Sequence, residues 1–163
     1  MRGVPDYLRR VIAVALLGPS LSIGSWLPAA AAESKPSSCE PGSSRPEDDL
    51  QRYKRDVACR IHARNSAQLY VGAPPPVLRS VVVLSVRIDN RGRPVRIGVV
   101  RSNGIRTLER QAIQSVRAAA PLPIPAAALR RRGTADITET WLFRDDGRFQ
   151  IRTLAQAQAP SGY

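Results

Sequence analysis

Three prolines alternate with apolar residues directly after a helix-like stretch, in SVRAAAPLPIP at positions 115–125. Proline fixes its own φ, lacks a backbone N–H, and biases the residue before it away from helical angles. A helix in this stretch must therefore end at about Ala120, and the chain must leave it extended. Because Leu122 and Ile124 lie between the prolines, we expect the extended segment to cross the end of a hydrophobic core in one fixed direction.

The residues before this exit predict an amphipathic helix over about 107–120. Its arginines and Gln114 fall on one side and its apolar residues on the other, at the spacing of a helix with one buried face. The apolar stripe consists of Leu108, Ala112, Ile113, Val116, Ala119 and Ala120.

Two alternating segments upstream predict a β-hairpin. In the first, Val82, Leu84, Val86 and Ile88 share one face. The sequence DNRG, with Gly92 last, is typical of a turn between strands. The second strand places Val95, Ile97 and Val99 on one face; Ser102, Asn103 and Gly104 then end it, with Gly104 permitting the positive φ that leads into the helix.

The remaining elements complete an α+β domain. A helix over about 45–66 begins at a capping box of Ser44 and Glu47, and its apolar face holds Leu50, Tyr53, Val57 and Ile61. Two strands close the chain, TADITETWLF and RFQIRTL; we have no explanation for Glu139, which falls on the apolar face of the first. The order predicts a small antiparallel sheet, a hairpin plus a C-terminal strand or hairpin, with two helices on one face.

Residues 1–32 have the three parts of a secretory signal peptide. A basic start is followed by an apolar stretch and by a small-residue exit of alanines, so we expect cleavage between Ala32 and Glu33. The alternative is a retained membrane anchor, since residues 11–32 are just long enough to span a bilayer. The rest divides into a linker (33–44), one domain (45–154) and a disordered tail (155–163).

The two cysteines, Cys39 and Cys59, are the only ones in the chain. In an exported protein an even pair of cysteines favours a disulfide over free thiols. We therefore expect them to be joined, closing a loop of about 20 residues.

The charge of the chain, +12 with 25 Lys and Arg against 13 Asp and Glu, indicates an anionic partner. Export disfavours nucleic acid, and favours an acidic protein, anionic lipid head groups or a cell-wall polymer. The alternative is that the arginines are spread over solvated faces and serve no partner.

Residues for catalysis are scarce. His62 is the only histidine, so we expect neither a catalytic triad nor a histidine-based metal site within one chain. We expect His62 to have a surface or capping role. The acidic doublets, Asp48-Asp49 and Asp145-Asp146, fall at predicted element ends, where carboxylates serve as helix-start charges or turn formers. We expect no enzyme activity, no cofactor, no metal site and no small-molecule substrate, and therefore a binding function.

The stretch from Val81 to Pro125 resembles the C-terminal domain shared by the TonB and TolA families. The likeness rests on a hairpin with a turn glycine, VVRSNG before the helix, and a helix that runs into a proline-rich exit; it extends over roughly 100 residues, one domain's worth. The form of the exit, APLPIP, favours TolA over TonB. The positions that carry the likeness are Gly92, Ser102, Asn103, Gly104, Leu108, Ala112, Pro121, Pro123 and Pro125.

The resemblance implies a periplasmic domain at the tip of an energy transducer, where it recruits an outer-membrane receptor or another envelope protein by adding a strand to a sheet edge. The last strand would lie at the rim with one side unpaired, aimed there by the proline exit, and it is our predicted partner-binding edge. Its residues are Arg148, Phe149, Gln150, Ile151 and Arg152.

The linker is shorter than the long spacer of these families. A cleaved chain would be a free adaptor in TonB-dependent transport or envelope integrity, and a chain that keeps its leader would be an anchored transducer facing the periplasm. A third hypothesis is a cationic binder of cell-wall or lipopolysaccharide anions.

Overall fold

The computed structural model of the protein describes Cys39 and residues 49–157. The leader, the capping box and residues 158–163 lie outside the described residues, so the predictions made for them stay predictions. The elements in chain order are α1 (Asp49–Arg64), η2 (Ser66–Gln68), β1 (Ser80–Asp89), β2 (Pro94–Arg101), α2 (Arg106–Ala118), η3 (Ala127–Leu129), β3 (Thr134–Phe143) and β4 (Phe149–Ile151).

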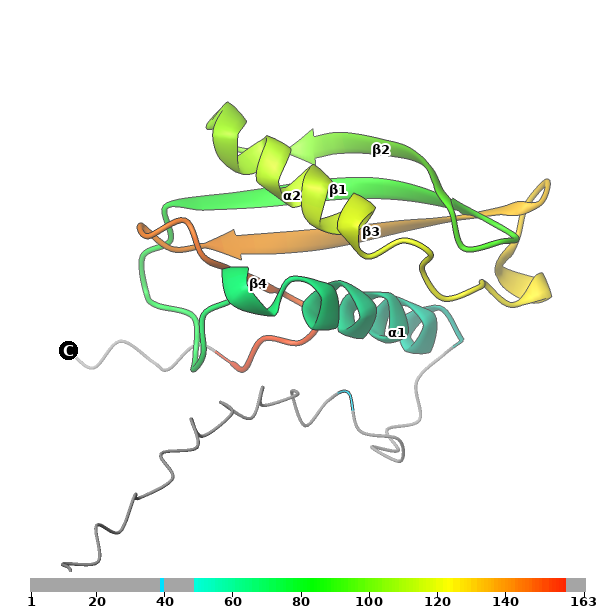
Figure 1. Cartoon of the computed structure of the whole chain (residues 1–163), viewed down its shortest axis with the longest axis horizontal. Helices are drawn as coiled ribbons and strands as arrows, with labels where there is room; N and C mark the ends of the chain where they lie inside the picture. Colours follow the sequence, from blue (N-terminus) through cyan, green and yellow to red (C-terminus); the bar gives the residue numbers. More distant parts are fainter. Residues whose placement is uncertain (1–38, 40–48, 158–163) are drawn as a thin grey trace, which may run out of the picture. The chain divides into compact units, whose positions relative to one another are not determined.

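The four strands form one antiparallel sheet in the order β2-β1-β3-β4. Both helices pack on the same face of this sheet (Figure 1), with α2 crossing the strands and α1 running beside β4. The predicted fold class, a small antiparallel sheet with two helices on one face, is therefore confirmed.

The two central strands, β1 and β3, pair without interruption from Ser80 opposite Phe143 to Asp89 opposite Thr134. The alternation of β1 places Val82, Leu84 and Val86 against the helices, where all three are buried. Successive side chains of a strand point to opposite faces, so this register also fixes which residues of β3 enter the core.

Several polar side chains inside the core, those of Asn65, Ser115 and Trp141, are hydrogen-bonded. The indole N–H of Trp141 donates to the Ser115 hydroxyl at 2.9 Å, and that hydroxyl donates to the carbonyl of Ala112 at 2.8 Å. The side-chain amide of Asn65, which follows α1, donates to the carbonyls of Ile61 and Ser115 at 2.7 and 3.1 Å. These bonds join the end of α1 to the middle of α2 and to β3.

Several side chains differ from the sequence-based prediction. Leu50 is exposed because it lies in the first turn of α1, ahead of the region that packs on the sheet, and Val95 and Val99 remain partly exposed because β2 is the outermost strand. Ala120 is exposed, since α2 ends two residues earlier. Residue 155, expected in a disordered tail, donates its backbone N–H to the carbonyl of Ile151 at 3.0 Å.

The predicted disulfide is confirmed: Cys39 is bonded to Cys59 in α1. It links the segment ahead of the domain to the middle of the first helix, 20 residues further along the chain. No helix in the described part of the chain has the length and apolar content that a membrane span requires.

Candidate functional site

The proline exit holds the hairpin turn and the two helices together. The N–H of Leu122 donates to the carbonyl of Gly92 at 2.8 Å, and the Tyr53 hydroxyl donates to the carbonyl of Pro123 at 3.0 Å. Burial raises the pKa of Tyr53 to about 12, so its hydroxyl keeps this proton at neutral pH. The Arg60 guanidinium donates to the carbonyl of Ala119, so one arginine of α1 supports the same junction.

Gly92 has a positive φ of 76°, and a Cβ there would lie 2.1 Å from the carbonyl oxygen of Leu122. Only glycine both adopts this φ readily and leaves room for the Leu122 carbonyl. The exit then leads through η3 into β3, a central strand. The expectation that it aims the final strand is therefore wrong, because β3 lies between the exit and β4.

The Ser102-Asn103-Gly104 turn has a structural role. Ser102 donates its hydroxyl to the Glu109 carboxylate and accepts from the Gly104 N–H at 3.0 Å. The Asn103 side chain accepts from the Ser80 hydroxyl at 2.6 Å and donates to the carbonyl of Arg79 at 2.9 Å. The motif thus fixes the end of β2 to the start of β1 and to the first turn of α2.

The edge formed by β4 is closed by residues 69–72, which we call the strap. Leu69 pairs in parallel with Phe149, and the N–H of Tyr70 donates to the carbonyl of Phe149 at 3.3 Å. The Gln150 side-chain amide donates to the carbonyls of Tyr70 and Gly72 at 2.9 and 2.8 Å. The strap and β4 are therefore held together by both backbone and side-chain hydrogen bonds.

These contacts correct the prediction for residues 148–152. β4 is at the rim of the sheet, and Phe149 and Ile151 are buried in the core as expected. The side expected to be unpaired instead contacts the strap, which sequence reasoning missed. The backbone N–H of Gln150 faces β3, because Gln150 lies opposite Leu142 between the bonds from Arg144 N to Arg148 O and from Arg152 N to Thr140 O.

The sequence contains a weak signal for the strap. Leu69 and Tyr70 are both buried, and Tyr70 carries the Arg144 guanidinium over its ring at 5.3 Å. Leu69 and Tyr70 therefore pack although they belong to no predicted element. Burial raises the pKa of Tyr70, whose hydroxyl has no hydrogen-bond partner among the described residues.

The opposite edge, β2, is open. Within residues 49–157 no backbone hydrogen bond connects the outer side of β2 to another segment. Val99 and Val100 are 42% and 61% exposed, and Arg96 and Arg101 are exposed on either side of them. The pairing with β1 is irregular at Val95 and Val100, the two residues of β2 that have no partner residue in β1.

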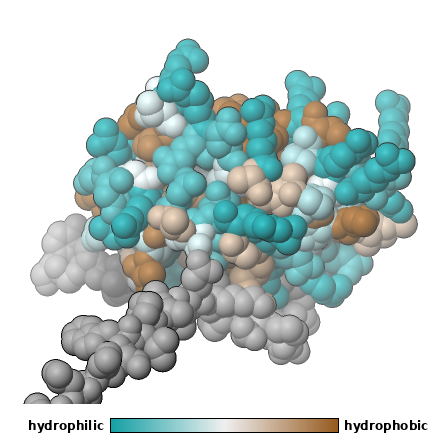
Figure 2. Space-filling model, in the orientation of Figure 1, coloured by the Kyte–Doolittle hydropathy of each residue, from teal (hydrophilic) through white to brown (hydrophobic). Residues whose placement is uncertain are grey.

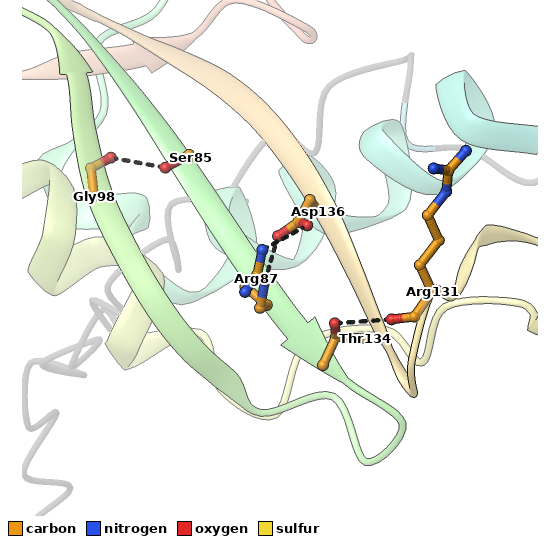
Figure 3. A network of polar contacts seen from close by, with 6 residues as sticks. All are labelled: Ser85, Arg87, Gly98, Arg131, Thr134 and Asp136. Atoms are coloured by element: carbon orange, nitrogen blue, oxygen red, sulfur yellow. Dashed lines mark hydrogen bonds and ion pairs between the residues drawn. The ribbon is translucent and has the colours of Figure 1, made fainter.

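The face of the sheet turned away from the helices carries an ion pair near the end that holds the β1–β2 turn (Figure 3). Arg87 of β1 donates to both carboxylate oxygens of Asp136 of β3, at 2.8 and 3.0 Å. These bonds lower the pKa of Asp136, and the charge of Arg96 lowers it further. A shallow depression of about 420 Å³ lies beside this pair, and its lining includes the small residues Ser85, Gly98 and Thr138.

Glu139 of β3 is the buried carboxylate that the sequence left unexplained. Its oxygens accept from the N–H of Thr140 at 2.8 Å and from the hydroxyl of Thr153 at 2.5 Å. Burial raises its pKa, while these bonds and the charge of Lys54 act in the opposite direction. Glu139 therefore attaches the segment after β4 to the centre of the sheet.

Among the described residues, no group of three or more His, Cys, Asp or Glu side chains could hold a metal ion. Hydrophilic residues dominate the helix-bearing face of the domain, with apolar residues between them in small groups (Figure 2). The feature best suited to hold a partner is therefore the open edge of β2. No protein family, curated protein or solved structure matches the chain.

Proposed function

We propose that this protein is a non-enzymatic binding domain that captures an extended segment of an envelope protein along the edge of β2. The observation that carries the proposal is the difference in pairing: the outer side of β4 is occupied by the strap, whereas the outer side of β2 has no backbone partner within residues 49–157. Unpaired backbone groups at a sheet edge are a template for another strand.

The side chains of β2 define the chemistry of the partner. Val99 and Val100 offer apolar contact to an arriving strand, and Arg96 and Arg101 offer positive charge at either end of it. An extended segment with apolar residues at its centre and acidic residues on its flanks complements this edge. The net charge of +12 favours the same class of partner over a basic one.

The resemblance to the TonB and TolA C-terminal domain supports a role in the periplasm, in TonB-dependent transport or envelope integrity. On this proposal the partner is an outer-membrane receptor or a periplasmic protein. A chain cleaved after Ala32 acts as a free adaptor, and a chain that keeps its leader acts as an anchored transducer. The intact mass of the exported protein distinguishes these two forms, since the cleaved form begins at Glu33.

Site-specific photo-crosslinking in cells tests the binding edge. A photoreactive amino acid replaces Val100 in β2, and the matched control replaces Val71 in the strap, which is 86% exposed. We expect the probe at position 100 to give one dominant adduct, on an extended segment of an envelope protein. A synthetic peptide of that segment should then slow amide hydrogen exchange in residues 95–101.

Two results would overturn the proposal. One is crosslinking from position 71 that equals or exceeds crosslinking from position 100. The other is peptide binding that protects amides elsewhere and leaves residues 95–101 unchanged, because strand addition must protect the edge that it covers.

A further inference from the structure

Seven of the 19 arginines within residues 49–157 lie at one end of the sheet, which we call the arginine tip. Four come from the β1–β2 hairpin and three from the loop before β3. The two segments meet because Asp89, at the end of β1, pairs with Thr134, and the N–H of Arg131 donates to the carbonyl of Thr134 at 2.7 Å. Both turns lie at the same end of the sheet in Figure 3. The members of the tip are Arg87, Arg91, Arg93, Arg96, Arg130, Arg131 and Arg132.

The carboxylates in these two segments do not balance this charge. Asp89 accepts from Arg93 at 2.7 Å, and Asp136 accepts from Arg87 at 2.8 Å. Each carboxylate is thus already paired with one arginine, and residues 87–96 and 130–136 contain no others. These two segments therefore carry five positive charges in excess.

Apolar side chains are exposed at the same end. Ile124 is 63% exposed, and it lies in the proline exit that is bonded to the hairpin turn through Leu122 and Gly92. Val95, next to the start of β2, is 53% exposed. A surface with excess guanidinium groups and exposed aliphatic side chains fits the boundary between lipid head groups and acyl chains.

The entry of the chain into the domain is at this end as well. Tyr53, in the second turn of α1, donates to the carbonyl of Pro123, so α1 begins beside the proline exit. Figure 1 shows the start of α1, the hairpin turn and the loop before β3 at one end of the domain. The helix that follows the apolar leader in sequence therefore starts from the tip.

We propose that the arginine tip docks the domain on an anionic membrane surface, with guanidinium groups on lipid phosphates and Ile124 at the head-group boundary. Guanidinium groups bind phosphate through paired hydrogen bonds, and their charge is attracted to the negative potential of anionic lipids. Docking by the tip leaves the part of β2 that holds Val99, Val100 and Arg101 available to a protein partner, and Arg96 belongs to both surfaces.

Co-sedimentation of the full-length chain with lipid vesicles tests the tip. Binding to vesicles of pure phosphatidylcholine is compared with binding to vesicles that also contain phosphatidylglycerol. Because every variant keeps the same leader, a difference between variants cannot come from the leader. The tip variant replaces Arg91, Arg131 and Arg132 by Gln. The matched control replaces Arg101, Arg110 and Arg148 by Gln, removing the same charge from exposed positions away from the tip.

We expect the tip variant to lose affinity for anionic vesicles by about fivefold for each arginine, on the order of a hundredfold in all. Its binding to phosphatidylcholine should not change, and the control should lose no more than a few-fold. Equal losses in the two variants would show that only net charge matters, and would overturn the proposal. Wild-type binding to a soluble phosphorylated polysaccharide without preference for anionic vesicles would overturn it too.

A second pair of variants separates docking at a membrane from simple charge attraction. Ile124→Gln and Val100→Gln remove apolar side chains of nearly equal exposure, 63% and 61%, at the tip and in β2. Ile124→Gln should weaken binding to anionic vesicles about tenfold, and Val100→Gln should leave it unchanged. Equal effects of the two variants would contradict the proposed orientation. Thermal unfolding of all four proteins, which carry changes at exposed or half-buried positions only, establishes that they are folded.

Discussion

The two edges of the sheet solve the problem of unpaired backbone in different ways. β4 has only three residues, and its outer side is covered by the strap; β2 has eight, and its outer side is uncovered within the described residues. The closed edge contributes Phe149 and Ile151 to the core, whereas the open edge contributes mainly Ile97, which is only partly buried. The difference teaches that position at the rim does not decide which strand is available to a partner: the segments packed beside it do.

Removing a side chain from each edge should give the largest contrast. Phe149 is fully buried, with its ring centroid 5.6 Å from that of Phe143, so Phe149→Ala should lower the free energy of unfolding by about 3–5 kcal/mol. Val99→Ala, at the open edge, should lower it by less than about 1 kcal/mol. Urea denaturation measures both. Similar losses would mean that β2 is packed as tightly as β4, against the comparison.

The strap can be loosened without changing the core. Gln150→Glu keeps the shape of the side chain but removes the two N–H donors that hold Tyr70 and Gly72. We expect a loss of about 1–2 kcal/mol and faster hydrogen exchange of the Tyr70 amide. Gln114→Glu, an equal change on the exposed side of α2, is the control. Unaltered exchange at Tyr70 would show that the backbone bonds alone keep the edge closed.

The buried carboxylate of Glu139 makes the free energy of unfolding depend on pH. Burial raises the pKa of Glu139 in the folded state, so the folded domain holds this proton more tightly than the unfolded chain does. Stability from this group is therefore greatest below the ordinary pKa of 4.5 and falls as pH rises through the folded value. Glu139→Gln should raise the free energy of unfolding at neutral pH, by up to about 1 kcal/mol.

Thermal unfolding of both proteins between about pH 4 and 8 covers the ordinary pKa of a carboxyl group. It separates the effect of the Glu139 charge from an effect of the substitution that does not depend on pH. The advantage of Glu139→Gln should shrink toward the acidic end. An advantage of constant size would mean that repacking, and not the charge of Glu139, explains it.

The exposed ion pair of Arg87 and Asp136, on the face of the sheet turned away from the helices, should give the smallest change in the free energy of unfolding. Its removal should lower this free energy, whereas Glu139→Gln should raise it. Arg87 lowers the pKa of Asp136, so the stability it contributes is present above the ordinary value of 3.8 and is lost as pH falls through the folded pKa. Both side chains are largely exposed, and Asp136→Asn should cost about 0.5 kcal/mol at neutral pH. A double-mutant cycle with Arg87→Gln measures the pair, and a coupling energy of zero would contradict this assignment.

The sequence predicts the sheet better than it predicts the edge. β1 alternates strictly and buries one whole face, which fixes its element type and its register at once. The strap cannot be predicted in this way, because Gln150 lies 80 positions from Tyr70 and the four strap residues show no alternation of buried and exposed side chains. Glu139 is similar: its bond to Thr153 depends on where the chain turns after β4, which no local pattern specifies.

The motif that carries the family resemblance is explained by local chemistry. Gly92 and the Ser102-Asn103-Gly104 turn are required by the backbone that they support, so their presence predicts the fold. They make no surface for a partner, and the surface residues of β2 have no pattern that marks them as a binding site. This is why the sequence predicts the fold but does not show that the strap covers the outer side of β4.

The disulfide changes how far the domain can be from whatever holds its leader. Asp49 is 17 residues from Ala32 in the sequence, so the chain between them spans at most about 60 Å. The disulfide joins Cys39 to Cys59 of α1, and Cys39 is only seven residues from Ala32, a span of at most about 25 Å. Reduction of the disulfide would therefore more than double the length of chain between Ala32 and the first point fixed to the domain.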